Sequence, residues 1–133
     1  MRGFHDDIEQ LTTGNSDFRR VLYTGKHIQL VLMTLQPGEQ IGAEVHTDRD
    51  QFFRFEEGEG TVDIDDNCYQ VTDGSGIIVP AGSRHNVRNT GDGPLKLYTL
   101  YASPEHKDGI VQSTKADADA RHAHEEWNGE TTE

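Results

Sequence analysis

Short strand-forming runs alternate with clusters of turn residues along the middle of the chain, and this pattern constrains the fold more than any other feature. The runs are rich in Val, Ile, Leu, Phe and Tyr, and the breaks between them fall at Gly, Pro, Asp and Asn. The predicted strands are residues 28–35, 41–46, 51–56, 61–64, 69–71, 77–79, 86–88 and 95–101. Strands this short, with turns this regularly spaced, predict an all-β sandwich or barrel.

The chain of 133 residues is long enough for one domain that buries a core without disulfide bonds. We expect a single domain over 1–133, divided into a polar and irregular N-terminal arm over 1–25, a barrel core at about 26–102, and a loop and tail over 103–133. The four residues from Thr114 to Asp117 resemble a helix capping box. Residues 116–127 have almost no apolar stripe, so we expect a short helix or a frayed tail there, loosely attached to the barrel.

The charge of the chain excludes two classes of partner. Acidic residues outnumber basic residues by 24 to 12, which gives a formal net charge of −12. Such a surface repels phosphate backbones and anionic lipids, so we expect neither nucleic acid nor a membrane as a partner. No apolar run approaches the roughly 18 residues of a membrane span, and the first residues lack the apolar core of a signal peptide. A soluble, cytoplasmic protein is therefore the expectation.

One segment of the predicted barrel fits the pattern G-x5-P-x-G-x2-H-x3-N at every position, through Gly74, Pro80, Gly82, His85 and Asn89. The two glycines can adopt turn conformations that other residues avoid. The proline fixes the backbone where a strand ends. The histidine then begins the next predicted strand, so a rigid turn sets the direction of its ring.

A second segment, 38–58, carries side chains that bind metals. Glu44 and His46 are two residues apart on a predicted strand, so both point to the same face. Gln51 follows after a four-residue turn, and we expect it to enter from the neighbouring strand. Any one of these residues alone is more often structural, but together with His85 they predict a site for one divalent metal.

The two segments resemble the paired motifs of the cupin superfamily, the first of which usually reads G-x5-H-x-H-x3-4-E-x6-G. Here Glu44 stands in place of the first histidine and Gln51 in place of the glutamate, while His46 and His85 are unchanged. The swap keeps one negative ligand. The resemblance covers about 26–102 and implies a double-stranded β-helix, or jelly-roll, barrel that pairs as a homodimer. A metal-free cupin whose ligands have drifted is the alternative.

The predicted ligands fit several divalent metals and do not identify one of them. Two histidines, a carboxylate and an amide suit Fe, Mn, Ni, Cu or Zn, and we favour Fe or Mn. Relatives of this kind include dioxygenases, isomerases, decarboxylases and lyases, so the resemblance implies a small metalloenzyme that acts on a small organic molecule. The alternative is a non-catalytic cupin that binds or senses a small ligand or a metal. The sequence assigns no catalytic residue.

The pocket around this site is expected to be mostly apolar. Strand alternation puts Phe53 on the same face as Gln51. The cupin resemblance places Leu97, Thr99 and Tyr101 inward on the last predicted strand. Such a lining, with one or two polar groups, is typical of a small-molecule site. Arg54, Arg84 and Arg88 are the guanidiniums near the motifs and none can be placed inward, which disfavours a sugar-phosphate substrate.

The segment after the last predicted strand allows two interpretations. Residues 103–109 are expected to form a plain surface turn. The alternative is a lid over the barrel, with Glu105 or His106 as a general acid or base. Further on, His122 and His124 have no second, fixed set of ligands nearby, so we expect them in a solvated tail.

Overall fold

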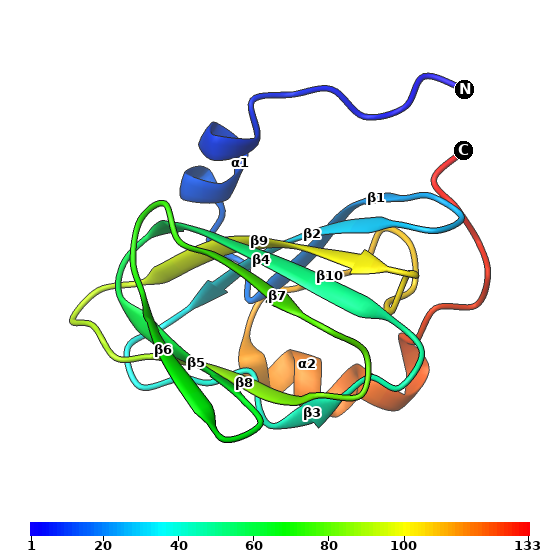
Figure 1. The fold of residues 1–133 in the computed structure, drawn as a ribbon. Helices are drawn as coiled ribbons and strands as arrows, with labels where there is room; N and C mark the ends of the chain where they lie inside the picture. Colours follow the sequence, from blue (N-terminus) through cyan, green and yellow to red (C-terminus); the bar gives the residue numbers. More distant parts are fainter.

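Two antiparallel sheets lie face to face in the computed structural model, which covers residues 1–133 (Figure 1). The strands are β1 (Arg19–Thr24), β2 (Gln29–Leu35), β3 (Glu44–Val45), β4 (Asp50–Glu57), β5 (Gly60–Ile64), β6 (Asn67–Val71), β7 (Gly76–Val79), β8 (Arg84–Asn89), β9 (Leu95–Ala102) and β10 (Val111–Gln112). One sheet has the order β10-β1-β2-β9-β4-β7 and the other β3-β8-β5-β6. This confirms the predicted all-β jelly-roll barrel.

Short helices flank the barrel at both ends of the chain. They are α1 (Ile8–Gly14), α2 (Lys115–Arg121) and the 3-10 turn η1 (His122–His124). The Thr114 hydroxyl accepts a hydrogen bond from the Asp117 N–H at 3.1 Å, so Thr114 is the N-cap of α2 at the position of the predicted capping box. The barrel strands are therefore followed by a short C-terminal helix.

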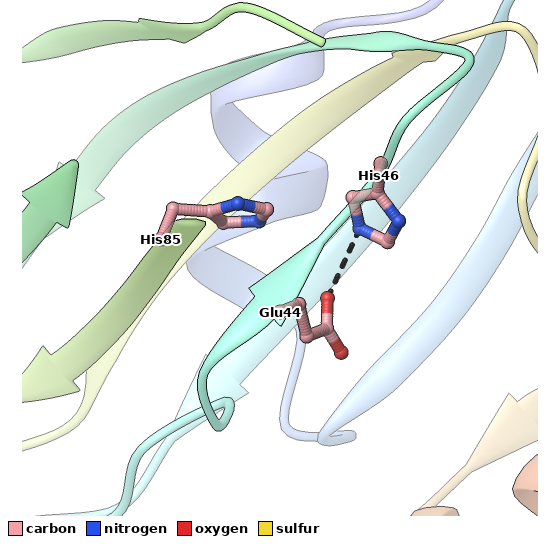
Figure 2. Close-up of side chains that lie close together, drawn as sticks. All are labelled: Glu44, His46 and His85. Atoms are coloured by element: carbon pink, nitrogen blue, oxygen red, sulfur yellow. Dashed lines mark hydrogen bonds and ion pairs between the residues drawn. The ribbon is translucent and has the colours of Figure 1, made fainter. Parts of the chain in front are cut away.

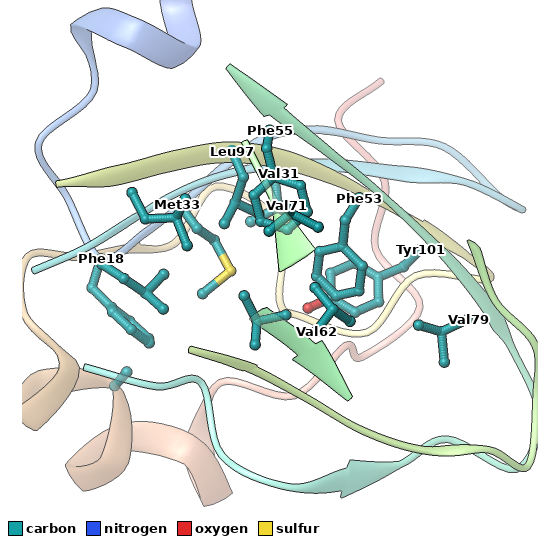
Figure 3. Close-up of a cluster of buried hydrophobic side chains, with 14 of the residues drawn as sticks. Phe18, Val31, Met33, Phe53, Phe55, Val62, Val71, Val79, Leu97 and Tyr101 are labelled. Atoms are coloured by element: carbon teal, nitrogen blue, oxygen red, sulfur yellow. The ribbon is translucent and has the colours of Figure 1, made fainter. Parts of the chain in front are cut away.

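The core fills the space between the two sheets (Figure 3). Along β9, every second residue is at most 2% exposed, which is the alternation that a strand buried on one face requires. Leu97 and Phe55 pair across β9 and β4, and the Phe53 ring stacks against Phe55 with centroids 6.4 Å apart. Burying each such side chain stabilises the fold by about 1.5–3 kcal/mol.

The N-terminal arm departs from the prediction of an irregular segment. Its residues 19–24 form β1, which pairs with β2 and β10 in the larger sheet. The buried positions of β1 are Arg19, Val21 and Thr24. Two of these three are polar, so the strand lacks the alternation of apolar and polar residues that sequence patterns detect.

The C-terminal tail is also more firmly attached than expected. Ala118 of α2 is 3% exposed and belongs to the hydrophobic core. Further on, the Trp127 N–H donates to the Glu105 carbonyl oxygen at 3.0 Å, and the Thr132 N–H donates to the Thr24 carbonyl oxygen at 2.9 Å. Backbone hydrogen bonds hold this tail, so the lack of an apolar stripe did not predict how firmly it is attached to the barrel.

The predicted strand 41–46 is reduced to the two residues of β3. Gly42 has a φ of 110°, which interrupts the extended backbone. The segment still follows β8, because the Ile41 N–H donates to the Val87 carbonyl oxygen at 2.9 Å. None of the helices has the length and apolar character needed to cross a membrane.

Candidate metal centre

Three of the predicted ligands meet at one edge of the smaller sheet (Figure 2). The nitrogen and oxygen donor atoms of Glu44, His46 and His85 all lie within 4.8 Å of one another. Glu44 on β3 pairs directly with His85 on β8, and His46 follows just after β3 ends. This arrangement is compatible with a metal site.

The glycine turns hold the two histidine segments together. Gly82 has a φ of 88°, a conformation that favours glycine, and its N–H donates to the His46 carbonyl oxygen at 2.8 Å. Gly74 has a φ of 90° at the preceding turn. The turns predicted from the G-x5-P-x-G-x2-H-x3-N pattern thus set the position of His85 relative to His46.

Charge at the centre is set by a contact between Glu44 and His46, whose Oε2 and Nε2 atoms are 3.1 Å apart. Burial on its own raises the pKa of Glu44, but this hydrogen bond and nearby positive charges outweigh it, so the pKa is lowered. The same hydrogen bond raises the pKa of His46, against the effect of burial. Burial lowers the pKa of His85, so its imidazole is neutral and ready to donate to a metal.

Contrary to the prediction from the sequence, Gln51 does not lie on a strand that neighbours β3. It belongs to β4 in the larger sheet, whereas β3 belongs to the smaller one, so the turn at 47–49 crosses between sheets instead of joining neighbouring strands. The Thr99 hydroxyl donates to the Phe52 carbonyl oxygen at 2.8 Å, and therefore accepts from Gln51 Nε2 at 2.9 Å. This fixes the amide orientation and leaves Gln51 Oε1 buried without a hydrogen-bond partner.

An unpaired buried acceptor costs about 1–3 kcal/mol, so the oxygen of Gln51 is a donor atom that no group of the protein uses. The four residues together offer two imidazole nitrogens, one carboxylate and one amide oxygen. First-row divalent metals accept such a mixed set. The donor chemistry therefore fits a divalent transition metal.

The predicted pocket residues separate into two groups. The Tyr101 ring lies 6.1 Å from that of His46, and the Phe53 ring lies 6.2 Å from that of His85. Thr99 holds the Gln51 amide, as described above. Leu97, by contrast, pairs with Met33 and Phe55 further along the barrel and lies in the hydrophobic core.

The expectation of a plain surface turn after β9 is wrong. We call residues 103–106 the lid segment. Within it, His106 is only 7% exposed, and its Nε2 lies 3.2 Å from the Tyr101 hydroxyl oxygen. The buried Gln29 side chain accepts from the N–H groups of Glu105 and His106 at 3.1 and 3.0 Å, and donates to the His106 carbonyl oxygen at 2.7 Å. Gln29 is more than 70 residues away from Glu105 and His106, so no local sequence pattern predicts this contact.

The lid segment also reaches the metal centre from outside. Glu105 Oε2 lies 3.5 Å from His46 Nδ1 and 2.8 Å from Arg49 Nη1. Burial raises the pKa of Glu105, while the charges of His46 and Arg49 oppose this effect. A cavity of about 230 Å³ lies beside these groups, lined also by Glu126 and Trp127. His46 thus has a carboxylate at each ring nitrogen.

Sequence reasoning missed one buried cation, Arg19, which is 6% exposed. The guanidiniums that it did consider do point outward: Arg54 pairs with Glu56, Arg88 pairs with Asp63, and Arg84 is exposed. The exposed His122 and His124 remain apart from the metal centre, as expected.

A jelly-roll barrel with a histidine and carboxylate cluster at one sheet edge is the architecture of a cupin. The cupin domain family matches residues 31–101 of this chain, and the chain belongs to that family. The crystal structure of BH2720 from Bacillus halodurans superposes with a TM-score of 0.88 and 49% sequence identity, covering 90% of this chain and 95% of that one.

Two curated relatives extend the comparison. The uncharacterized protein YrkC of Bacillus subtilis is 51% identical over 118 residues, which is 84% of this chain and 63% of YrkC. The polyketide synthase CurC of Streptomyces cyaneus is 33% identical over 73 residues, which is 55% of this chain and 47% of CurC. The chain thus spans less than two thirds of either protein.

Proposed function

We propose that Glu44, His46, Gln51 and His85 hold one divalent transition metal, and that the protein is a small metalloenzyme acting on a small organic molecule. The observation that carries this proposal is the convergence of three donor side chains within 4.8 Å. The buried, unpaired oxygen of Gln51 supports a fourth ligand. Fe or Mn is the preferred metal, and Ni, Cu and Zn are the alternatives that the same nitrogen and oxygen donors accept.

Each residue has a distinct task in this proposal. Glu44 supplies the only negative charge, and the neutral His85 supplies a nitrogen without giving up a proton. The pKa of His46 is raised beside Glu44, so a proton competes with the metal for this ring. Gln51 is a neutral and weak donor, so this ligand exchanges most readily with a substrate group. The bound metal would supply Lewis-acid or redox chemistry.

The surroundings support an organic substrate. Phe53 and Tyr101 border the two histidines with aromatic rings, which suits a carbon skeleton better than a simple ion. One relative is the polyketide synthase CurC, whose name points the same way. The cupin fold alone does not fix the type of reaction, so turnover assays have to identify it.

Metal content tests the proposal directly. Protein purified without added metal is analysed for Fe, Mn, Ni, Cu and Zn, beside His46→Ala, Gln51→Ala and the control His124→Ala. We expect about one ion per chain in the wild type and the control, little in His46→Ala, and a lower content in Gln51→Ala. Equal content in all four proteins would refute the ligand assignment.

Turnover then separates an enzyme from a binding protein. The metal-loaded protein is incubated with a panel of small organic acids, alcohols and sugars, with and without O2. Conversion that His46→Ala abolishes supports the enzyme. An unmodified organic ligand recovered from the purified protein, with no conversion of any panel member, would favour the non-catalytic cupin instead.

A further inference from the structure

Arg19 lies on the inner face of the larger sheet. Its neighbours across the sheet are Met33 on β2 and Gln112 on β10, and both are at most 1% exposed. The next residue, Arg20, points the other way, with a half-exposed side chain and an ion pair to Asp17 at 3.7 Å. Two successive arginines therefore face opposite sides of one strand, and only Arg19 faces the interior.

The Arg19 charge has no ionic partner within the protein. Its Nη1 donates to Gln112 Oε1 at 2.7 Å, and the guanidinium stacks over the Phe18 ring at 5.3 Å. Its Nε is buried and has no hydrogen-bond partner. Nε and Nη2 form the edge of a guanidinium that grips a carboxylate with two parallel hydrogen bonds. On this edge of the Arg19 guanidinium, the buried Nε has no partner within the protein.

The charges around Arg19 do not balance it once a metal is present. The guanidinium contributes to the lowered pKa of Glu44, after burial and the His46 contacts. Burial raises the pKa of Tyr101 far above its ordinary value, and burial together with the Arg19 charge lowers that of His106. Both side chains are therefore neutral. A divalent ion with the Glu44 carboxylate carries a net charge of about +1. The nearby Glu105 carboxylate is paired with Arg49, and Arg19 adds a second positive charge.

We propose that Arg19 binds the anionic group of the substrate, a carboxylate or similar oxyanion on a small organic acid, while another part of that acid faces the metal. This inference rests on the proposed function, since it names the substrate class of the same site. Burying an unpaired charge is costly, and an anion that enters the barrel neutralises it. The rest of the protein is strongly acidic, so this interior attracts anions that the outer surface repels.

The test compares organic acids with their uncharged amides on protein loaded with Mn²⁺. Binding of acetate, pyruvate and oxalate is followed by the change in water-proton relaxation at the metal, beside acetamide, pyruvamide and oxamide. We expect the acids to bind and the amides to bind far more weakly. Arg19→Gln is expected to weaken acid binding by about 10- to 100-fold while its Mn²⁺ content stays unchanged.

Two further variants make the result specific. Arg20→Gln, which removes the adjacent outward charge, is expected to bind the acids as the wild type does. Arg19→Lys keeps the charge but loses the two-pronged geometry, so an intermediate affinity is expected, and it replaces Arg19→Gln if the latter does not fold. Acid binding that is unchanged in Arg19→Gln, or amides that bind as tightly as acids, would overturn the proposal.

Failure of the metal proposal is distinguishable from failure of this one. If the wild type holds no Mn²⁺ or other metal, the proposed function fails. The Arg19 proposal is then judged on the metal-free protein, by the rise in melting temperature that oxalate produces. A rise that Arg19→Gln abolishes and Arg20→Gln retains supports an anion site, and an equal rise in all three proteins refutes it.

Discussion

The two sides of the metal centre are held in place by different means. On the motif side, which comprises Glu44, His46 and His85, paired strands and glycine turns position the side chains through backbone hydrogen bonds. On the lid side, the Gln29 side chain holds the backbone of Glu105 and His106 across more than 70 residues. Backbone turns leave a pattern in the sequence, whereas a buried side-chain contact leaves none.

The largest effect is expected on the motif side, at a glycine that packs against another strand. Gly58 has a φ of 93°, and an added Cβ would overlap the Pro94 carbonyl oxygen. Strain and overlap together predict that Gly58→Ala lowers the free energy of unfolding by about 3–5 kcal/mol. Urea unfolding measures this loss.

Gly74→Ala is the matched control for that change. Gly74 has nearly the same φ, 90°, but nothing lies within 4 Å of its Cβ position. Only the backbone strain remains, so a loss of about 1–2 kcal/mol is expected. If both variants lose the same amount, the close contact with Pro94 contributes nothing and the turn alone fixes this region.

On the lid side, Gln29→Ala removes the anchor of the lid segment. The variant leaves the buried N–H groups of Glu105 and His106 without acceptors, so the free energy of unfolding should fall by about 2–4 kcal/mol. Hydrogen exchange should show faster opening of these two amides. The exposed Gln70→Ala is the control and should change stability by no more than about 0.5 kcal/mol. Slow exchange retained in Gln29→Ala would show that other contacts hold the lid.

This contrast explains how much was predictable. The donor spacing placed Glu44 and His46 on one face, and the resemblance to the paired cupin motifs brought in His85, which the pairing of β3 with β8 sets opposite Glu44. The spacing did not reveal the strand arrangement around Gln51, since local pattern does not say that the chain crosses to the other sheet before β4. It failed for Arg19 as well, because only the pairing of β1 shows which of two adjacent arginines faces inward.

A contact between the two sides gives the next prediction. Glu105 faces Nδ1 of His46, so it can hold that ring with Nε2 toward the metal. Glu105→Ala should weaken Mn²⁺ binding by about 10-fold or more, as measured by competition with a chelator. Glu126→Gln, in the same outer cavity but without a contact to His46, should bind Mn²⁺ normally. Equal affinities in the two variants would show that the motif side orients His46 unaided.

The last prediction concerns the pH dependence that His106 gives to the lid side. Burial is the main cause that lowers its pKa, and the charges of Arg19, His122, His46 and Arg49 act in the same direction. The unfolded chain then binds a proton near pH 6.5 while the folded chain does not. Stability is therefore full above about pH 6.5 and falls as the pH drops toward the folded-state pKa, by up to about 1.4 kcal/mol per pH unit.

A difference measurement isolates this group, because His46, whose pKa is raised, changes stability in the opposite sense over a nearby range. His106→Gln keeps an acceptor for the Tyr101 hydroxyl but cannot titrate. Urea unfolding of the metal-free wild type and this variant between pH 7 and pH 5 should show a gap that closes, or reverses in favour of the variant, as the pH falls. A constant gap would mean that His106 accepts a proton within the fold, so the lid segment would have to open to water far more readily than its contacts with Gln29 imply.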